Sequence, residues 1–396
     1  NGLDYMIYYN MYTLLFPPGV STGEKETADL HIYPNPFNNI LHIELRDAAG
    51  YEIFSGNGLL IKSGSLNTGN DPGQRPAWID MKDLKTKILD QTAGDLGEIE
   101  KALLENLQPN LDLVSTVAEH ILFSGGKRLR PLLMVLCARL CGYRGSYDHT
   151  FSIIFEYLHA ATLLHDDLID DATLRRGKPA AHTVFGNATA VLVGDFLLAR
   201  GLSIAAATGQ PKIIEIMADI TENMSQGEIH QLQRKGQLDL TETEYLEIIR
   251  CKTAVLFQGA CRISALLAEA SEKREAGLAD YGYHLGMAFQ MVDDLLDYSD
   301  STTTIGKSVG ADLKEGKLTL PVIYALQQAG QVERQKMEQI IGDAHFSVEA
   351  FETLKALLQQ NRGIAYTQNL AEEHIAKAKN ALNIFDASET RDILLD

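Results

Sequence analysis

The sequence predicts an all-α helical domain that follows a small β-rich N-terminal segment, and three observations support this prediction. Residues 1–80 are rich in Gly, Pro, Asn and aromatic residues and hold short runs of alternating hydrophobicity. From residue 81 onward, hydrophobic residues recur with the period of an α-helix. Two Asp-rich motifs, at 166–170 and 293–297, each lie within an apolar stretch of helical pattern. We therefore expect two domains in the 396-residue chain, 1–80 and 81–396.

The N-terminal segment carries a motif of its own. The runs Ile40–Leu45 and Tyr51–Phe54 alternate between apolar and polar residues, which predicts β-strands. The sequence YPNPFN at Tyr33–Asn38, followed by a strand and later by Trp78–Met81, resembles the C-terminal sorting domain of bacterial proteins exported by the type IX secretion system. The alternative is a simple Pro-Asn turn ahead of a strand. Because a sorting domain belongs at the end of an exported protein, its position here indicates an upstream fusion or a read-through, with Met81 as the natural start of the helical domain.

The helical domain is expected to be helix almost throughout. Its first stretch places hydrophobic residues on one stripe, at Leu84, Ile88, Leu96, Ile99, Leu103, Leu104 and Leu107. Loops are expected near 143–148, 172–187, 300–317 and 342–347, where turn-forming residues interrupt the helical period. The chain stops at 394–396, inside what the pattern predicts to be a final helix.

Composition and hydropathy exclude several classes of protein. Hydrophobic residues make up 45% of the chain, which is ample for a sizeable core. The formal net charge of −18 argues against nucleic acid as a partner, but not against an anionic substrate, because local cations set the field inside a site. The longest apolar stretch, 188–208, is interrupted by Asp195 and Arg200, so we expect no membrane span. The four cysteines lack a CxxC spacing and are expected to be thiols of a cytoplasmic protein.

Two carboxylate clusters carry the strongest chemical signal. The first cluster is Asp166, Asp167 and Asp170, and the second cluster is Asp293, Asp294 and Asp297. At helical spacing, residues i, i+3 and i+4 share a face, so we expect the carboxylates of each cluster to point one way. Two carboxylates about 4 Å apart repel by roughly 4 kcal/mol at an effective dielectric constant near 20, so cations are expected between them. Mg²⁺ is usually held by one or two carboxylates together with substrate phosphates and water, which predicts a Mg²⁺–diphosphate site between two facing helices.

The alternative for both clusters is a pair of solvated helix faces. Charged runs without a buried role usually lie among other polar residues. The stretches around both motifs are apolar instead, as in Tyr157–His165 and Gly286–Val292. The apolar flanks therefore favour the metal site.

Further basic and polar groups along the chain are of the kinds that bind a diphosphate. The run Gly125–Pro131, GGKRLRP, places three cations behind a flexible Gly pair, enough to bind a second diphosphate without a metal. Arg175 and Arg176 lie in the loop after the first cluster, so their side chains can reach the phosphates that bind at that cluster. The set is completed by Lys252, Thr253, Gln290 and Lys307. Each of these groups taken alone has a simpler interpretation as a solvated surface residue.

With these motifs in this order, residues 81–396 resemble the trans-polyprenyl diphosphate synthase family from end to end, and in particular its octaprenyl diphosphate synthases. The matching sequences are GGKRLRP, the two DDxxD motifs, GKPAAHTVFGNATAVLVGD at 177–195, QGE at 226–228, KTA at 252–254, FQMVDDLLDY at 289–298 and GKSVGADLKEGKLTLP at 306–321. The resemblance implies an isoprenoid synthase helical bundle around a central active-site cavity. It also implies a homodimer, and transient membrane contact when the product is released.

The resemblance further implies a role for each motif residue. The diphosphate of isopentenyl diphosphate would be bound by Lys127, Arg130, His159 and Arg176. Mg²⁺ on the allylic substrate would be held by Asp166, Asp170 and the second cluster, with Asp167 beside them. The allylic diphosphate, or the cation that it leaves behind, would be contacted by Arg175, Lys252, Thr253, Gln290 and Lys307. For His159 the alternative is a core histidine, and His165 is expected to be structural.

Small residues near the first cluster predict a long product. The growing chain must run along the helix that carries Asp166, where a residue five positions earlier lies about 7.5 Å further down. That residue is Ala161, with Thr162 beside it, and Leu158 or a neighbouring helix would form the floor. Short-chain members of the family often place aromatic rings here, so we expect an open passage and a product of about C30 to C50. The alternative is that small residues merely allow close helix packing.

Four other functions were weighed against chain elongation. A class I terpene cyclase has a second metal motif of Asn or Asp, Ser or Thr, and Glu, which the sequence at 293–297 does not match. A silent regulatory subunit typically loses one cluster or the basic loop, and both are present here. A short-chain farnesyl or geranylgeranyl diphosphate synthase stays open as an alternative. A P-loop around Gly306–Ser308 fails because Ser301 stands where the first glycine is required.

Overall fold

The computed structural model describes residues 81–145, 147–298, 310–343 and 345–396, together with the backbone of four strands that precede them. The chain forms two compact units: Phe16–Asp80, and a unit that contains Met81–Asp396. Of the residues predicted to form the site, Lys307 lies outside the described residues.

The first unit contains two antiparallel hairpins. Strand β1 (Leu30–Asn35) pairs with β2 (Ile40–Leu45), with Leu30 opposite Leu45. Strand β3 (Gly50–Phe54) pairs with β4 (Leu60–Ser65), and the register shifts at Ile53 and Phe54.

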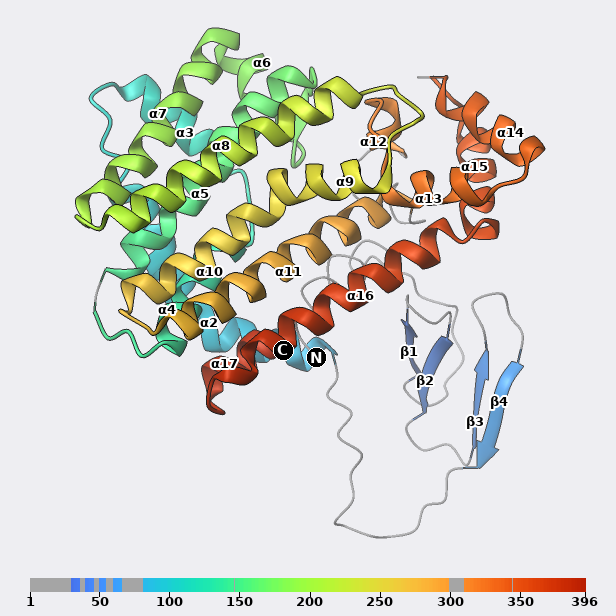
Figure 1. Cartoon of the computed structure of the whole chain (residues 1–396), viewed down its shortest axis with the longest axis horizontal. Helices are drawn as coiled ribbons and strands as arrows, with labels where there is room; N and C mark the ends of the chain where they lie inside the picture. The colour runs from blue at the N-terminus through green and yellow to red at the C-terminus, as the bar shows by residue number, and fades with distance from the viewer. Residues whose placement is uncertain are drawn as a thin grey trace. The chain divides into compact units, whose positions relative to one another are not determined.

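The second unit is a helical bundle, which confirms the all-α prediction (Figure 1). Its first half comprises α2 (Met81–Glu105), α3 (Asp112–Leu122), α4 (Leu129–Leu140), α5 (Asp148–Ile169), the short hairpin β5 (Leu174–Arg175) and β6 (Lys178–Pro179), α6 (Ala181–Phe185), α7 (Asn187–Ala207) and α8 (Pro211–Arg234). Its second half comprises α9 (Glu242–Ile249), the π-helix η1 (Arg250–Ala254), α10 (Val255–Leu267), α11 (Glu272–Leu296), α12 (Ala311–Lys314), α13 (Leu320–Gln328), α14 (Gln331–Ile341), α15 (Val348–Gln360), α16 (Gly363–Ala381), the 3-10 helix η3 (Leu382–Ile384) and α17 (Glu389–Leu395).

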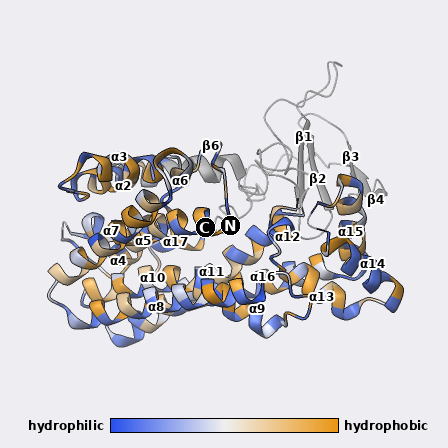
Figure 2. Cartoon of the chain, turned by 90° about the horizontal axis from the view of Figure 1, so that it is seen from above, coloured by the Kyte–Doolittle hydropathy of each residue, from blue (hydrophilic) through white to orange (hydrophobic). Residues whose placement is uncertain are grey.

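Local sequence signals account for several helix boundaries. Pro211 and Pro321 lie in the first turns of α8 and α13, where a missing backbone N–H costs no hydrogen bond. Helix α9 begins with a capping box, in which Thr241 accepts a hydrogen bond from the Glu244 N–H while the Glu244 carboxylate binds the Thr241 N–H. In Figure 2, hydrophobic and hydrophilic segments alternate along the helices, as expected of amphipathic helices that pack around a core.

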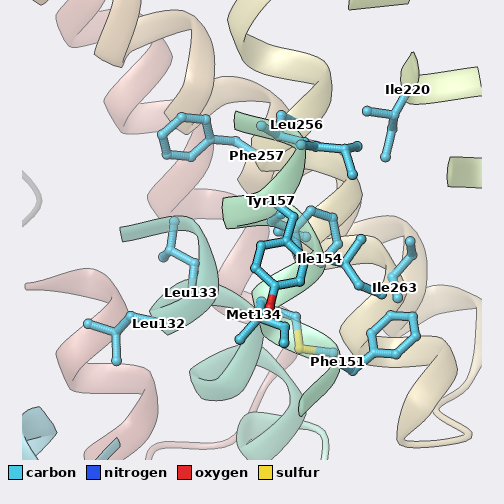
Figure 3. Close-up of a cluster of buried hydrophobic side chains, with 14 of the residues drawn as sticks. Leu132, Leu133, Met134, Phe151, Ile154, Tyr157, Ile220, Leu256, Phe257 and Ile263 are labelled. Atoms are coloured by element: carbon cyan, nitrogen blue, oxygen red, sulfur yellow. The ribbon is translucent and has the colours of Figure 1, made fainter. Parts of the chain in front are cut away.

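The largest core lies where α4, α5, α8 and α10 meet. Figure 3 shows Met134, Ile154, Tyr157 and Phe257 converging there from three of these helices, and all four are fully buried. The buried Tyr157 hydroxyl donates a hydrogen bond of 2.7 Å to the carbonyl oxygen of Leu103 on α2. This core fixes α5, and with it the first carboxylate cluster, against α10.

Two glycines bring helices unusually close to η1. A Cβ atom added to Gly286 on α11 would lie 2.6 Å from Cα of Ala254, and one added to Gly227 on α8 would lie 2.7 Å from Cβ of Cys251. Only glycine fits at either place without a shift of the backbone. As a result η1 is enclosed between α8 and α11, and π-helical turns of this kind often occur at functional sites.

Helix α7 is the one described helix that is long and apolar enough to cross a membrane, judged by length and composition alone. It packs against α5, but only 39% of its most apolar stretch of 18 residues is buried. Leu192, in its second turn, is 65% exposed, so α7 presents an apolar side chain outside the core.

Candidate active site

Both carboxylate clusters lie at the C-terminal ends of long helices. Asp166 and Asp167 are in the last turn of α5, and Asp170 directly follows that helix. The second cluster occupies the corresponding position on α11, with Asp297 directly after its last residue. The free carbonyl groups at a helix C-terminus carry partial negative charge, so carboxylates there are unfavourable and cations are favoured.

The carboxylates of the first cluster do not all point one way. Asp167 is buried and forms an ion pair with Arg175, whose Nε lies 2.8 Å from its Oδ1 atom. The prediction of one shared face is therefore wrong for Asp167, because adjacent residues on a helix diverge by about 100°. Arg175 is consequently held by a carboxylate of the protein itself. Asp166 and Asp170 take no part in this ion pair.

The second cluster diverges in the same way. Asp293 is exposed, whereas Asp294 is buried. Asp294 accepts hydrogen bonds from the Tyr245 hydroxyl at 2.6 Å and from Nε2 of Gln290 at 2.8 Å. The prediction that this cluster forms one face is wrong for Asp294, which is used to join α9 to α11.

Asp297 ties the end of α11 to the start of α12. Its carboxylate accepts the backbone N–H groups of Ala311 at 3.0 Å and Asp312 at 3.2 Å. A carboxylate at a helix N-terminus is favoured by the free N–H groups there. The contact fixes the segment that carries Lys317 beside the second cluster.

Lys317 then links this segment to the first cluster. Its Nζ atom donates to Oδ2 of Asp170 at 2.6 Å and to Glu315 at 2.7 Å. Its backbone N–H binds the carbonyl oxygen of Asp312 at 2.8 Å. Asp170 belongs to the first DDxxD motif and Lys317 to the motif at 306–321. These two motifs therefore meet, although the two residues are 147 positions apart.

The π-helix η1 places two predicted residues between the clusters. Nζ of Lys252 lies 2.7 Å from Glu228 of the QGE motif. The Thr253 hydroxyl donates to Oε1 of Gln290 at 2.7 Å, and Gln290 in turn binds Asp294. Thr253 and Gln290 are thus in direct contact, with Lys252 next to Thr253 on η1.

The electrostatics of the site fit a bound divalent cation. Burial raises the pKa of Asp166 to about 6, with Glu228 and Asp170 adding to the effect against the attraction of Lys252. Burial likewise raises the pKa of Asp294 to about 7, although its two hydrogen bonds oppose the shift. The raised pKa values mean that negative charge is penalised at Asp166 and Asp294, and a cation would remove that penalty. At Asp170, by contrast, burial is outweighed by the hydrogen bond and charge of Lys317, which lower the pKa.

No group of three or more His, Cys, Asp or Glu residues in the described part of the chain is arranged as a ready metal cage. Mg²⁺ does not require one, since it is commonly bound by one or two carboxylates with the remaining positions taken by phosphate oxygens and water. Asp166, Asp170 and Asp293 would supply such carboxylates, and the residues present therefore fit Mg²⁺ that arrives with a diphosphate.

A basic cluster, made of Lys127, Arg130, His159 and Arg176, adjoins the carboxylates. A Cβ atom on Gly126 would lie 3.0 Å from Nη1 of Arg176, so the Gly-Gly loop and the Arg-Arg loop are in contact. The guanidinium of Arg130 stacks over the Phe257 ring at 4.7 Å. Lys127 is exposed at the same loop.

The pKa values of His159 and Arg130 reflect their burial and the positive charge of the basic cluster. Burial, together with the charges of Arg130 and Arg176, lowers the pKa of His159 well below its usual value, so this imidazole is neutral. Burial also lowers the pKa of Arg130 to about 10, a shift that Glu156 and Asp293 oppose.

The third cation of the GGKRLRP loop, Arg128, is turned into the protein. Its guanidinium donates to Glu100 at 2.6 Å, to Glu156 at 2.7 Å and to the carbonyl oxygen of Leu122 at 2.6 Å. The prediction that all three cations of this loop bind the diphosphate is therefore wrong for Arg128. Arg128 instead positions the loop, because two carboxylates from α2 and α5 satisfy its charge.

The predicted chain-length residues lie in the core of α5. Ala161 and Leu158 are 3% and 1% exposed, and Thr162 binds the carbonyl oxygen of His159 at 2.9 Å. Cδ1 of Leu158 would lie 2.8 Å from a Cβ atom on Gly201, so Leu158 packs directly against α7.

Sequence reasoning missed several residues of the site. Lys317, Asp312 and Glu228 lie inside motifs that were recognised, and their charge in those motifs was a usable signal. Tyr245 and Lys235 lie outside every motif. Their roles depend on contacts across 49 and 65 residues respectively, the second being the separation of Lys235 from Asp170 (235 − 170).

Comparison with known sequences places the helical unit among prenyl synthases. A family model described as polyprenyl synthetase matches residues 111–358, and one described as a secretion system C-terminal sorting domain matches residues 31–86. The octaprenyl diphosphate synthase of Escherichia coli (strain K12) is 39% identical over 313 residues, which cover 78% of this chain and 95% of that protein. The all-trans-nonaprenyl-diphosphate synthase (geranyl-diphosphate specific) of Rhodobacter capsulatus is 37% identical over 315 residues, covering 79% and 96%.

Solved structures agree with these relatives. A polyprenyl synthase from Caulobacter crescentus CB15, complexed with calcium and isoprenyl diphosphate, superposes with a TM-score of 0.73 at 38% identity, covering 78% of this chain and 94% of that one. A decaprenyl diphosphate synthase from Rhodobacter capsulatus gives a TM-score of 0.74 at 36% identity, covering 78% and 96%. The expected isoprenoid synthase fold is confirmed, as is the resemblance of the N-terminal segment to a sorting domain.

Proposed function

We infer the reaction from one premise: the chain belongs to the polyprenyl synthetase family and is a trans-prenyltransferase. It condenses isopentenyl diphosphate with an allylic diphosphate in successive Mg²⁺-dependent head-to-tail steps, and releases a long-chain all-trans polyprenyl diphosphate. The observation that supports this proposal is the hydrogen bond from Lys317 to Asp170 of the first cluster, because Lys317 belongs to the segment whose Ala311 and Asp312 N–H groups bind Asp297 of the second cluster.

The allylic diphosphate binds at the carboxylate clusters. Asp166, Asp170 and Asp293 would hold Mg²⁺, which when bound neutralises part of the charge on the diphosphate leaving group. Lys252 and Lys317 add point charges on the same side. As the allylic C–O bond breaks, its electron pair leaves with the diphosphate, and these preplaced charges stabilise the group that departs.

Isopentenyl diphosphate binds at the basic cluster without a metal. Arg130 and Arg176 present planar guanidinium groups suited to bidentate phosphate contacts, and neutral His159 offers a hydrogen bond without further positive charge. The double bond of isopentenyl diphosphate supplies the electron pair of the new C–C bond to the allylic cation. A proton then leaves the adjacent carbon, and the departing diphosphate accepts it.

Aromatic and apolar groups exclude water from the allylic cation. The Phe257 and Phe289 rings lie 5.2 Å apart at the junction of α10 and α11, next to the guanidinium of Arg130. Water would add to the cation and end the reaction, so a dry wall protects the intermediate.

The decisive experiment is product analysis with the full chain. Labelled isopentenyl diphosphate is incubated with geranyl, farnesyl or geranylgeranyl diphosphate, with Mg²⁺ or with EDTA, and the dephosphorylated products are sized. Products of about C30 to C50 that require Mg²⁺ support the proposal, consistent with the small residue at Ala161. Products that stop at C15 or C20 support the short-chain alternative. No product from any primer supports a silent subunit of a heteromeric synthase.

We further propose a homodimer that forms through α7 and α8. On α7, Leu192, Ala199, Ser203 and Ala206 are exposed at spacings that place them on one helix face, with the exposed Asp195 at its edge. The adjoining α8 leaves three large apolar residues exposed, Ile214, Ile229 and Leu232. A second copy that packs on this face would bury both stripes and account for the apolar character of α7.

Light scattering tests the dimer. The wild type is expected at twice the mass of the chain, and Leu192→Glu at a larger monomer fraction, whereas Val332→Glu on α14, also exposed, should change nothing. A monomeric wild type would refute the dimer.

The four free cysteines suit the reducing cytoplasm that we propose as the location, with transient membrane contact on product release.

A further inference from the structure

Two turns from distant parts of the chain fit together beside the first carboxylate cluster. The N–H of Gly236, just past the end of α8, donates a hydrogen bond of 2.8 Å to the carbonyl oxygen of Gly316. A Cβ atom on Gly316 would lie 3.2 Å from Cγ of Lys235, and the φ angle of Gly316 is +75°. The left-handed backbone favours glycine at 316, and the missing Cβ atom eases the close approach of the two turns.

The turn that carries Lys235 is anchored on its other side. Nη2 of Arg234 lies 3.0 Å from Asp239 and 3.4 Å from Glu244. Glu244 also belongs to the capping box of α9 with Thr241. The backbone position of Lys235 is therefore fixed both by α9 and by the Gly316 turn.

Lys235 and Lys317 bind the two oxygen atoms of one carboxylate. Nζ of Lys317 is 2.6 Å from Oδ2 of Asp170, and Nζ of Lys235 is 3.5 Å from Oδ1. Lys317 also pairs with Glu315 and is 14% exposed, whereas Lys235 is 34% exposed. Lys235 is thus the less tightly held of the two.

An ion pair of this length and exposure contributes little to folding. When the charge of Asp170 is taken up by a cation, the ammonium of Lys235 loses its attraction to that carboxylate. The oxygens of a diphosphate that accompanies the cation would then be available to it as acceptors. A lysine on an anchored turn reaches them with a small change of its side chain.

We propose that Lys235 is a further diphosphate-binding residue, which pairs with Asp170 in the free protein and with the allylic diphosphate in the substrate complex. This inference rests on the proposed function for the identity of the ligand. Its chemistry, an ammonium and a metal-bound diphosphate, does not depend on the length of the product.

The test compares the full-length wild type with Lys235→Ala, Lys235→Arg and the control Lys101→Ala. Lys101 on α2 is also a lysine in a loose ion pair, 3.7 Å from Glu98, and it lies outside the site. Binding of inorganic diphosphate with Mg²⁺ is measured by calorimetry, and KM is measured separately for each substrate. We expect Lys235→Ala to weaken diphosphate binding by about 5- to 20-fold and to raise KM for the allylic substrate by a similar factor.

The controls separate binding from folding. Lys235→Arg should bind within about threefold of the wild type, because it keeps the charge, and Lys101→Ala should match the wild type. KM for isopentenyl diphosphate should stay within about twofold, and the melting temperature of Lys235→Ala within about 2 °C.

Several outcomes would overturn the inference. They are unchanged diphosphate binding in Lys235→Ala, an equal rise of both KM values, a loss of binding that accompanies a large fall in melting temperature, and a wild type that does not bind diphosphate. A wild type that binds diphosphate through Lys235 but forms no prenyl product would refute the proposed function and leave this inference standing.

Discussion

The hydroxyl of Tyr245 donates a hydrogen bond of 2.6 Å to Oδ2 of Asp294, across the boundary between α9 and α11. Both residues are buried, and the other carboxylate oxygen is bound by Gln290, which also accepts the hydroxyl of Thr253. The second cluster is therefore connected through side chains to η1. A carboxylate whose pKa is raised to about 7 by burial is kept in place by these two donors.

Replacing Tyr245 by Phe should loosen this carboxylate. The variant keeps the ring and removes one hydrogen bond to a buried acceptor, so we expect a loss of about 1–2 kcal/mol in the free energy of unfolding in urea. Activity should also fall, because Asp294 is then held by Gln290 alone. The control is Tyr366→Phe, which removes a phenol hydrogen bond of 2.7 Å to Glu242 away from the clusters and should affect stability only. Equal activity losses in the two variants would contradict a special role for Tyr245.

The divergence of adjacent aspartates predicts two different phenotypes. Asp166→Asn removes charge from the site, and kcat should fall by about 10²-fold or more, equivalent to about 2.7 kcal/mol of transition-state stabilisation, with little change in unfolding. Asp293→Asn should behave likewise. Asp167→Asn instead breaks a buried ion pair with Arg175 and should lower the free energy of unfolding by about 1–3 kcal/mol.

Steady-state kinetics and urea denaturation are compared for the three variants and for the wild type treated with EDTA. Full activity in Asp166→Asn and Asp293→Asn, or activity that survives EDTA, would refute the metal site. Stability of Asp167→Asn equal to that of the wild type would show that its pair with Arg175 is not structural.

The helical unit is expected to be catalytically active without residues 1–80 of the chain. Every described residue assigned to the site lies beyond Met81, where α2 begins. A chain that starts at Met81 should therefore retain kcat/KM within about threefold of the full chain. A loss above about tenfold, with the helical circular dichroism spectrum intact, would show that the β-strand unit contributes to the site.

The main features of the fold and site followed from patterns that local sequence carries. Helical periodicity predicted the all-α unit, and the KTA and FQMVDDLLDY motifs contain Thr253 and Gln290, which the structure shows in contact. The rest depended on contacts that spacing does not encode. Arg128 is turned inward because Glu100 and Glu156, each 28 residues away, supply the carboxylates that satisfy it. Lys317 and Lys235 meet at Asp170 through the contact of the turn after α8 with the turn after α12.

A three-helix ion network away from the site predicts a pH dependence of stability. Asp95 on α2 binds Arg139 of α4 at 2.6 Å and His149 of α5 at 3.1 Å. Burial alone would raise the pKa of Asp95, but the hydrogen bonds from His149 and Arg139 outweigh it and lower the pKa to about 2. Stability from this carboxylate is thus present above its unfolded pKa near 3.9 and is lost as pH falls toward 2.

His149 contributes with the opposite sign. Its pKa is raised, mainly by the hydrogen bond to Asp95, so its contribution is present below its unfolded pKa of about 6.5 and is lost as pH rises through the raised value. Asp95→Asn should therefore cost about 1–2 kcal/mol at pH 5, and less at pH 2 and at pH 8. The exposed Asp90→Asn on the same helix serves as control. A cost that does not vary with pH would exclude the charge as its origin.

Ala161 is the position at which product length is expected to be set. It lies five residues before Asp166 on α5, about 7.5 Å further from the metal-binding end, and it is buried between α5 and its neighbours. A growing chain that extends along α5 passes this position, and an aromatic ring there would close the passage after a few isoprene units. Ala161→Phe should therefore shorten the product to roughly C15 or C20 while condensation continues.

A matched variant distinguishes blockage from general damage to the core. Overpacking a buried site costs about 1–3 kcal/mol, so Ala161→Phe is compared with Ala160→Phe, which introduces the same ring at the adjacent position, also 3% exposed but about 100° around the helix. Only Ala161→Phe should shift the product distribution, as measured by sizing the dephosphorylated prenols. If the wild type already stops at C15, or if both variants leave the distribution unchanged, the growing chain does not run along this face of α5.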